Sequence, residues 1–446
     1  MTEISHRIRM AIELENCRIH PSSSSSSSSN HEFYIPLTHF DIPFLQSDPT
    51  QRFIFFDFPY SNLHFHENIL PSLKISLSLT LTHFLPLAGH VVLPLNSGTP
   101  SIRCVSGDSI SLITLQSDQN LHYLASHDQR ISDHFYECVP KLPFATRCAD
   151  SVVFPVVALQ ITLFADQGIC IGITNHHVVA DGSSIVNFVK LRGCANRFGD
   201  GESFHQTVGR HFLVINRNLV EDHEKLDSIA WKFSPFGSSP HKNQVQNLKN
   251  HVYANTPNSR NVSSFMVISA YAWICALRAA ASSDDNEEEI FYFSFAADCR
   301  GRLNPPLPES YFGNCLVFVR AGARRGSLKK KGGFLIAVES IREATRRILQ
   351  SDRGVVESAD WPLDFRKNSG QCVVSVAGSP RFDVYEADFG WGKPRKQEFV
   401  HLDRQRSISL CKSRDFEGGF ELGLSRNKAE MDIFEQVFGD PNLALD

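Results

Sequence analysis

The stretch of sequence that decides the fold reads Asn175-His176-His177-Val178-Val179-Ala180-Asp181-Gly182. Two β-rich runs, 152–164 and 169–177, lead into it, and a helix is predicted from about 183 to 196. His177 is therefore expected at the end of a strand, just before a turn, where a side chain can project into a cleft while its backbone stays fixed. Because an imidazole has an ordinary pKa of about 6.5, a neutral ring at this place accepts a proton near pH 7.

Two interpretations of His177 are open from this context: a general base, or a buried histidine satisfied by a backbone carbonyl. Asp181 either orients the imidazole or anchors the turn by pairing with an arginine, and the four-residue separation across a tight turn favours anchoring. His176 is expected on the opposite face, because alternate side chains of a strand diverge. A second His-x-x-x-Asp pattern, His223 to Asp227, has charged neighbours and is interpreted as solvated surface.

The composition is typical of a globular protein that acts on small molecules. A length of 446 residues suggests two or three domains. Hydrophobic residues make up 42%, charged residues 21% and the net charge is -4, so no large field attracts nucleic acid. The sequence contains no apolar run of about 18 residues, so no membrane span is predicted. The N-terminus lacks a secretory pattern, and a cytosolic location is therefore expected. The 11 cysteines lack a Cys-x-x-Cys pair, which favours reduced thiols and no metal site.

The rest of the chain alternates between ordered and polar segments. Ser22 to Ser29 is an unbroken serine tract and is expected to be a disordered loop. Residues 70–84 fit both a strand and a helical stripe, and their length favours a helix. Residues 198–260 are polar and form the best candidate for an interdomain crossover. The second half is predicted to contain a helix over 265–280, a strand over 291–296 and a helix over 334–349.

The His-x-x-x-Asp-Gly pattern of His177 to Gly182 is followed late in the chain by Asp388-Phe389-Gly390-Trp391-Gly392. With these two motifs the sequence resembles the plant BAHD acyltransferases, which are defined by His-x-x-x-Asp-Gly and a late Asp-Phe-Gly-Trp-Gly. Their order, about 210 residues apart, is a strong joint signal. Further matches are Leu37-Thr38-His39-Phe40-Asp41, the run 83–89, and Tyr311-Phe312-Gly313-Asn314-Cys315. The last is similar to the branch that acylates anthocyanin and other flavonoid glycosides.

The resemblance implies an α/β fold of two similar chloramphenicol-acetyltransferase-like domains, each a mixed sheet flanked by helices, with a tunnel between them. The predicted boundaries are 1–197 for the domain with the histidine motif, 198–260 for the crossover, and 261–446 for the domain with the Asp-Phe-Gly-Trp-Gly motif. Acyl-CoA would be a co-substrate that enters from one mouth, and a phenolic glycoside would enter from the other. No permanently bound cofactor, metal, nucleic acid or membrane partner is expected, and the protein is expected to be a monomer.

The resemblance also implies roles for single residues. His177 would deprotonate the acceptor hydroxyl, so that the alkoxide attacks the thioester carbonyl without a covalent enzyme intermediate. Trp391 is the family-suggested donor to the oxyanion. The alternative for Trp391 is structural, because Gly390 and Gly392 permit a tight turn that Asp388 can hold through an arginine.

Further implied positions lie outside these two motif centres. Asp181-Gly182 is expected to be structural, with Arg300 or Arg302 as the partner of the carboxylate. Ser263-Ser264 resembles the family's CoA-contacting stretch, since a helix N-terminus offers free backbone donors to phosphate. The alternative there is a plain helix N-cap. The basic loop 324–331 could also reach a phosphate, although a solvated surface loop is the favoured interpretation.

The sequence departs from the family in two places, and the donor and rival functions stay open. Residues 198–260 are short and polar where the family places a strand and a helix, and Lys190-Leu191-Arg192 lacks the aromatic residue common after the motif helix.

The acyl donor stays open. Malonyl-CoA needs a cation for its carboxylate, which 182–189 does not supply, and hydroxycinnamoyl-CoA needs an apolar pocket. The branch resemblance favours malonyl. Two alternative functions are a thioester hydrolase and an inactive relative that binds CoA or a glycoside. The sequence has no Gly-x-Ser-x-Gly nucleophile elbow, which speaks against the hydrolase.

Overall fold

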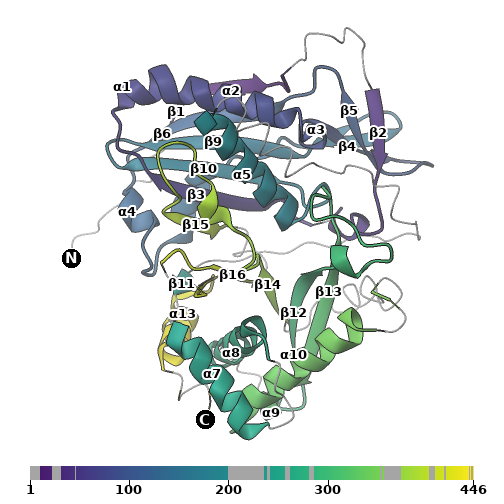
Figure 1. Cartoon of the computed structure of the whole chain (residues 1–446), viewed down its shortest axis with the longest axis vertical. Helices are drawn as coiled ribbons and strands as arrows, with labels where there is room; N and C mark the ends of the chain where they lie inside the picture. The colour runs from purple at the N-terminus through teal and green to yellow at the C-terminus, as the bar shows by residue number, and fades with distance from the viewer. Residues whose placement is uncertain are drawn as a thin grey trace. The chain divides into compact units, whose positions relative to one another are not determined.

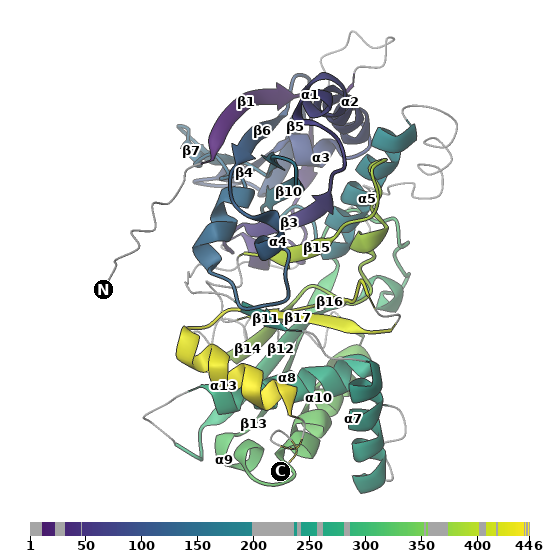
Figure 2. The same ribbon diagram turned by 90° about the vertical axis from the view of Figure 1, so that its left-hand side faces the viewer.

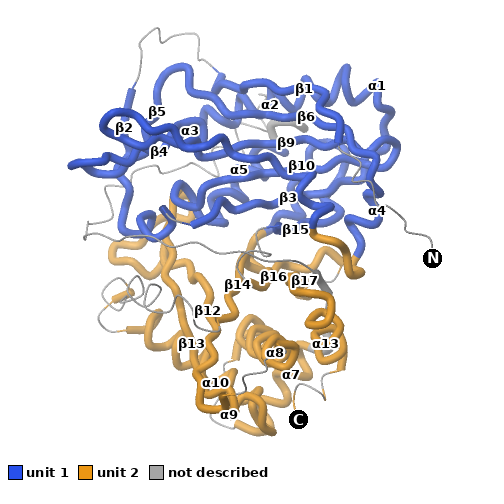
Figure 3. The backbone as a smooth tube through the Cα atoms, turned by 180° about the vertical axis from the view of Figure 1, so that it is seen from behind, with its two compact units in different colours: residues 1–126, 133–223, 383–401 blue, residues 127–132, 224–382, 402–446 orange. Residues whose placement is uncertain are grey.

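The computed structural model describes most of the chain as two compact units. The described residues are 11–22, 32–45, 47–198, 236–238, 242–256, 262–280, 286–351, 354–355, 373–400, 407–415, 418–440, 442 and 445. Unit 1 comprises residues 1–126, 133–223 and 383–401, and unit 2 comprises residues 127–132, 224–382 and 402–446 (Figure 3). The predicted serine-tract loop lies almost entirely outside the described residues, and so does His223.

The larger sheet of unit 1 has, within the described residues, the strand order β1-β6-β9-β10-β3-β15. These strands are β1 (Ile12–Ile19), β3 (Thr50–Asp57), β6 (Ile110–Ser117), β9 (Val157–Phe164), β10 (Gly168–Asn175) and β15 (Lys396–Phe399). β6 and β9 run parallel, and the other neighbours run antiparallel. Every residue of β9 and β10 is buried, so the pair forms the centre of the sheet. Residues 165–167 form the turn between them, with Asp166 at a φ of 57°.

A second sheet and several helices complete unit 1. The sheet has the order β2-β5-β4-β8-β7: β2 (Glu32–Pro36), β4 (His90–Pro94), β5 (Ser101–Val105), β7 (Thr146–Arg147) and β8 (Ser151–Pro155). The helical segments are η1 (Ile42–Phe44), α1 (Asn62–His64), η2 (Phe65–Ile69), α2 (Leu70–Leu81), α3 (Leu85–Ala88), α4 (Leu121–Leu124), η3 (Ser132–Cys138), α5 (Gly182–Phe198) and η6 (Val384–Glu386). Figure 1 and Figure 2 show α2 and α5 packed against each other on one face of the larger sheet.

Unit 2 is one mixed sheet with helices, ordered β11-β17-β16-β14-β12-β13 within the described residues. The strands are β11 (Phe236–Ser238), β12 (Ile290–Asp298), β13 (Leu316–Arg324), β14 (Val373–Ala377), β16 (Ile408–Lys412) and β17 (Phe420–Leu424). The helices are α7 (Lys242–Asn255), α8 (Ser264–Ala279), η5 (Arg300–Arg302), α9 (Arg325–Lys329), α10 (Gly333–Leu349) and α13 (Lys428–Gly439). The nearly all-apolar α8 is buried because it packs against α7, α10 and α13.

The elements confirm the predicted fold class of mixed sheets flanked by helices, and they correct two details. The predicted helices over 70–84, 183–196, 265–280 and 334–349 correspond to α2, α5, α8 and α10. Residues 198–260, read as lacking a formed strand and helix, contain β11 and α7. Helix α7 was not predicted because its composition is polar, since only one narrow face of the helix is buried.

The second correction concerns the domain boundary. The predicted C-terminal domain 261–446 included the Asp-Phe-Gly-Trp-Gly motif, whereas residues 383–401 belong to unit 1. The reason is strand pairing, since β15 runs antiparallel to β3 from Lys396 opposite Phe55 to Phe399 opposite Arg52. Both family motifs therefore lie in the same unit.

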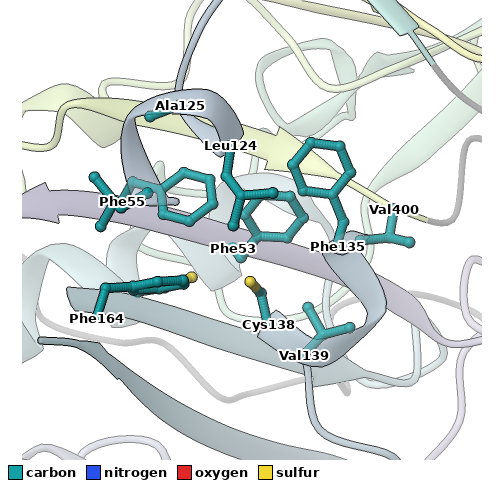
Figure 4. Packing of buried hydrophobic residues seen from close by; sticks show 11 residues of the cluster. Phe53, Phe55, Leu124, Ala125, Phe135, Cys138, Val139, Phe164 and Val400 are labelled. Atoms are coloured by element: carbon teal, nitrogen blue, oxygen red, sulfur yellow. The ribbon is translucent and has the colours of Figure 1, made fainter. Parts of the chain in front are cut away.

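A buried hydrophobic cluster joins this late segment to the core of unit 1. Figure 4 shows Phe53 and Phe55 of β3 facing residues from α4 and η3, with Val400 at the edge of the cluster. Phe53 stacks on Phe135 with ring centroids 5.2 Å apart, and Val400 is 2% exposed. Burial of this apolar surface stabilises β15 beside β3. No helix among the described residues is long and apolar enough to cross a bilayer.

Candidate active site

The backbone presents His177 just after the end of β10, a fully buried strand. β10 pairs on both sides, with β9 and with β3, as far as Asn175. The amide of His176 then donates to the carbonyl of Val156 at 2.9 Å, and the amide of Val179 donates to the carbonyl of His176 at 3.3 Å. The strand therefore ends in a hydrogen-bonded turn that contains His177, as the sequence predicted.

Phe44 fixes the plane of the His177 ring. The two rings stack with centroids 4.0 Å apart and an interplanar angle of 17°. Phe44 ends η1, which follows a turn in which Asp41 accepts from the amide and the hydroxyl of Thr38, both at 2.8 Å. The run Leu37 to Asp41, quoted above as a family match, therefore has a physical role: it positions the aromatic ring that holds the imidazole. The His177 side chain is only partly buried.

His176 has different surroundings from its neighbour. Its ring lies 4.6 Å from that of Phe154, and its buried Nδ1 has no hydrogen-bond partner among the described residues. Burial lowers the pKa of His176 from 6.5 to about 4, so the ring is neutral at pH 7. His176 and His177 thus pack against different aromatic rings.

Asp181 caps helix α5. Its Oδ1 accepts from the amide of Ser184 at 3.0 Å, its carbonyl accepts from the amide of Ile185 at 3.1 Å, and the residue is 1% exposed. An N-cap aspartate satisfies one of the free amides of the first helical turn and suits the positive end of the helix dipole. Gly182 is the first residue of α5. These contacts support the structural role expected for Asp181-Gly182.

The residues Asp388 to Gly392 form a tight turn. Asp388 Oδ1 accepts from the amide of Gly390 at 2.8 Å and from that of Gly392 at 3.2 Å. Gly390 and Gly392 have φ values of 102° and 115°, a region that side chains other than glycine rarely adopt. The motif therefore needs its aspartate as a backbone acceptor and its two glycines for conformation.

Trp391 lies in an aromatic cluster within this turn. Its ring stacks on Phe389 with centroids 5.5 Å apart and meets Phe56 and Phe58 edge-on at 6.0 Å and 5.8 Å. Its buried Nε1 has no hydrogen-bond partner among the described residues. Buried indole N–H groups usually find an acceptor, so this donor is unusual.

Arg300 and Arg302 stand in unit 2, at the turn after β12. Arg300 is 4% exposed, lies 3.2 Å from Asp298 Oδ1, and donates to the carbonyls of Tyr311 and Gly313 at 3.3 Å and 3.1 Å. Arg302 is exposed and donates to the carbonyl of Asp298 at 2.7 Å. Arg300 therefore ties the Tyr311–Cys315 signature to the end of β12, and its expected pairing with Asp181 stays a prediction.

The residues expected to contact CoA have local partners of their own. Ser263 is the N-cap of α8, and its hydroxyl accepts from the amide of Met266 at 3.1 Å; Ser264 is the first residue of that helix. The segment 324–331, predicted as a solvated loop, contains the last residue of β13 and helix α9, with Arg325 buried. There Arg324, Arg325 and Lys330 pair with Glu288, Glu289 and Glu287 respectively. The helix N-terminus remains the stronger phosphate candidate, because carboxylates already face these three cations. Among the described residues, no group of three His, Cys, Asp or Glu side chains could hold a metal.

Comparison with known proteins decides the family. Residues 13–440 match a profile described as the Transferase family. The chain is 36% identical over 447 residues, covering 95% of this chain and 94% of the relative, to a malonyl-coenzyme:anthocyanin 5-O-glucoside-6'''-O-malonyltransferase of Salvia splendens. The chain belongs to the BAHD acyltransferases, within the Transferase family. It is also 38% identical over 424 residues, 90% of this chain and 92% of the relative, to phenolic glucoside malonyltransferase 1 of Nicotiana tabacum.

Solved structures support the fold of this BAHD acyltransferase. Vinorine synthase superposes with a TM-score of 0.68 over 95% of this chain and 96% of that chain, at 22% identity. F. sporotrichioides TRI101, crystallised with coenzyme A and T-2, gives a TM-score of 0.66 over 90% and 97% at 17% identity. At these identities the likeness concerns the fold alone.

Two contacts near the motifs escaped the sequence analysis. Phe44 lies far from His177 in the chain, and nothing in its local pattern indicates stacking on an imidazole. Arg192 was noted only for replacing a common aromatic residue, yet its guanidinium carbon lies 5.6 Å from the centroid of Phe389. The unusual residue type was the available signal, because arginine is rarely buried in the middle of a helix.

Proposed function

We propose that this acyltransferase moves a malonyl group from malonyl-CoA to a sugar hydroxyl of a phenolic glycoside, with His177 as the general base. The observation that carries the proposal is the strand-end imidazole, partly buried and held flat against Phe44. The names of the relatives support the substrates, since those at 36% and 38% identity are malonyltransferases of anthocyanin and phenolic glucosides. A coumaroyl-CoA-dependent relative from Arabidopsis thaliana is less similar, at 29%.

In the proposed reaction, the neutral imidazole of His177 takes the proton of the sugar hydroxyl as the oxygen attacks the thioester carbonyl. The tetrahedral intermediate collapses, the carbon–sulfur bond breaks, and the imidazolium returns its proton to the thiolate of CoA. General-base help of this kind contributes about 10² to 10⁴ in rate. Trp391 is the proposed donor to the oxyanion, and its unpartnered Nε1 supports this role. Acyl-CoA serves as a co-substrate, with Ser263-Ser264 proposed to meet its phosphates.

The proposal is tested by mixing the purified protein with malonyl-CoA, with and without a phenolic glucoside, and following free thiol and product mass. One thiol released for each malonyl ester formed is the expected result. Thiol release without acceptor would favour a thioester hydrolase, and no release with malonyl-, acetyl-, coumaroyl- or caffeoyl-CoA would favour a binding protein. The cytosolic location and the monomeric state remain predictions, to be checked by cell fractionation and light scattering.

His177→Ala should lower kcat by at least about a hundredfold while the melting temperature stays within a few degrees of wild type. His223→Ala is the matched control, because it disrupts the other His-x-x-x-Asp pattern of the chain, and it should leave kcat unchanged. Equal activity of the two variants would remove His177 from the mechanism.

A further inference from the structure

Helix α5 buries a guanidinium that no acidic side chain among the described residues compensates. Arg192 is 1% exposed, and its Nε and Nη2 have no hydrogen-bond partner among the described residues. Its guanidinium carbon lies 5.6 Å from the centroid of the Phe389 ring. Burial lowers the pKa of Arg192 to about 10, so the group remains a cation at neutral pH. A buried cation without a counter-ion destabilises a fold, and an apolar residue of similar size would fit better.

The next residue brings the same turn still closer to the helix. A Cβ added at Gly193 would lie 3.0 Å from the carbonyl oxygen of Asp388, tighter than ordinary van der Waals contact. Gly193 therefore allows the backbone of the Asp388–Gly392 turn to rest on α5, while Arg192 holds the first aromatic ring of that turn. Two adjacent residues thus dock the late motif on one point of the helix.

The opposite end of α5 carries the histidine motif. Asp181 caps the helix, and His177 lies in the turn just before that cap. Arg192 lies eleven positions after the cap, which is about 16 Å along a helix. Arg192 is therefore too far away to touch a substrate at His177. An α-helix is stiff over this length, so a displacement at Arg192 is carried to the turn that holds His177.

We infer that Arg192 and Gly193 are positioning residues, which clamp α5 to the Asp388–Gly392 turn and thereby fix how His177 is presented to the acceptor hydroxyl. The inference rests on the proposed function. It accounts for a buried charge at a place where the family commonly has an aromatic residue: the cation anchors the face of Phe389 at a cost in stability. Residues that break a local packing rule are often those that serve activity.

The test compares Arg192→Met and Gly193→Ala with the exposed control Arg346→Met on α10. For Arg192→Met we expect a melting temperature equal to or above wild type, because the unpaired charge is gone, together with a kcat lowered by about tenfold or more and a KM for acyl-CoA within about twofold. Gly193→Ala should lower kcat in the same way, and Arg192→Lys should recover part of the loss. Arg346→Met should change nothing.

A kcat of Arg192→Met within about twofold of wild type would overturn the inference, and so would a lower kcat accompanied by a lower melting temperature, which indicates a purely structural residue. If Arg192→Met does not fold, Gly193→Ala decides by the same criteria. A second readout needs no turnover: peptide-resolved carbethoxylation of His177 by diethylpyrocarbonate should change by at least about threefold in Arg192→Met. An unchanged rate refutes the positioning role, whereas inactivity of the wild type with every donor refutes only the proposed function.

Discussion

The pH dependence of stability should reveal the buried histidine next to the proposed base. The folded-state pKa of His176 is lowered by burial from 6.5 to about 4. Below pH 6.5 the unfolded chain therefore binds a proton that the folded protein does not, and stability falls as the pH falls. Each pH unit in that window costs about 1.4 kcal/mol for one group. At pH 5 the loss from His176 is about 2 kcal/mol, and it approaches about 3 kcal/mol near pH 4.

The measurement is urea unfolding at pH 7 and pH 5 for the wild type and for His176→Gln, which cannot titrate in this range. Other groups titrate in both proteins, so the difference between the two pH-dependent losses isolates His176. We expect the wild type to lose about 2 kcal/mol more than the variant over this interval. Equal losses in both proteins would mean that the ring is protonated as easily in the fold as in the unfolded chain, and the burial argument would fail.

Three further outcomes are expected. Gly172→Ala should prevent folding, because its Cβ would lie 2.0 Å from a backbone carbonyl oxygen, whereas Gly439→Ala, with nothing within 4 Å, should yield folded protein by circular dichroism. Trp391→Phe should keep the melting temperature within a few degrees and lower kcat by about a hundredfold; an unchanged kcat would assign the indole to packing alone. Tyr271→Phe should lower the free energy of unfolding by about 1 to 2 kcal/mol in urea titrations, since its hydroxyl donates to the carbonyl of Phe438 at 2.7 Å.

The fold was predictable where periodicity and length agreed. The helices α5 and α10 follow from apolar residues that recur every three or four positions, and α8 follows from an apolar run long enough for a buried helix. The buried strands β9 and β10 follow from their β-branched runs. The polar helix α7 was missed because a helix with one narrow buried face resembles a loop in composition. The sequence analysis also did not predict that residues 383–401 belong to unit 1. The four residues of the edge strand β15 do not indicate which strand they pair with.

The site was predictable in its residue types and less so in its contacts. The position of His177 at a strand end follows from local sequence, whereas the cap formed by Asp181 was in neither interpretation of that residue. The stacking of Phe44 and the docking of Arg192 on Phe389 depend on packing between segments far apart in the chain. Such contacts depend on three-dimensional complementarity, which a periodic pattern in one segment does not carry.

Helix α5 also bears on which acyl donor the enzyme accepts. A malonyl carboxylate needs a cation beside it, and residues 182–189, which follow the histidine motif, contain none. The first cation of the helix is Lys190, about 12 Å along the axis from the start of α5, and the guanidinium of Arg192, about 15 Å along, faces Phe389. Under the proposed function, residues 182–189 of α5 therefore do not supply the cation that selects malonyl. The start of the helix would then govern how fast His177 acts, and residues outside 182–189 would govern which thioester it acts on.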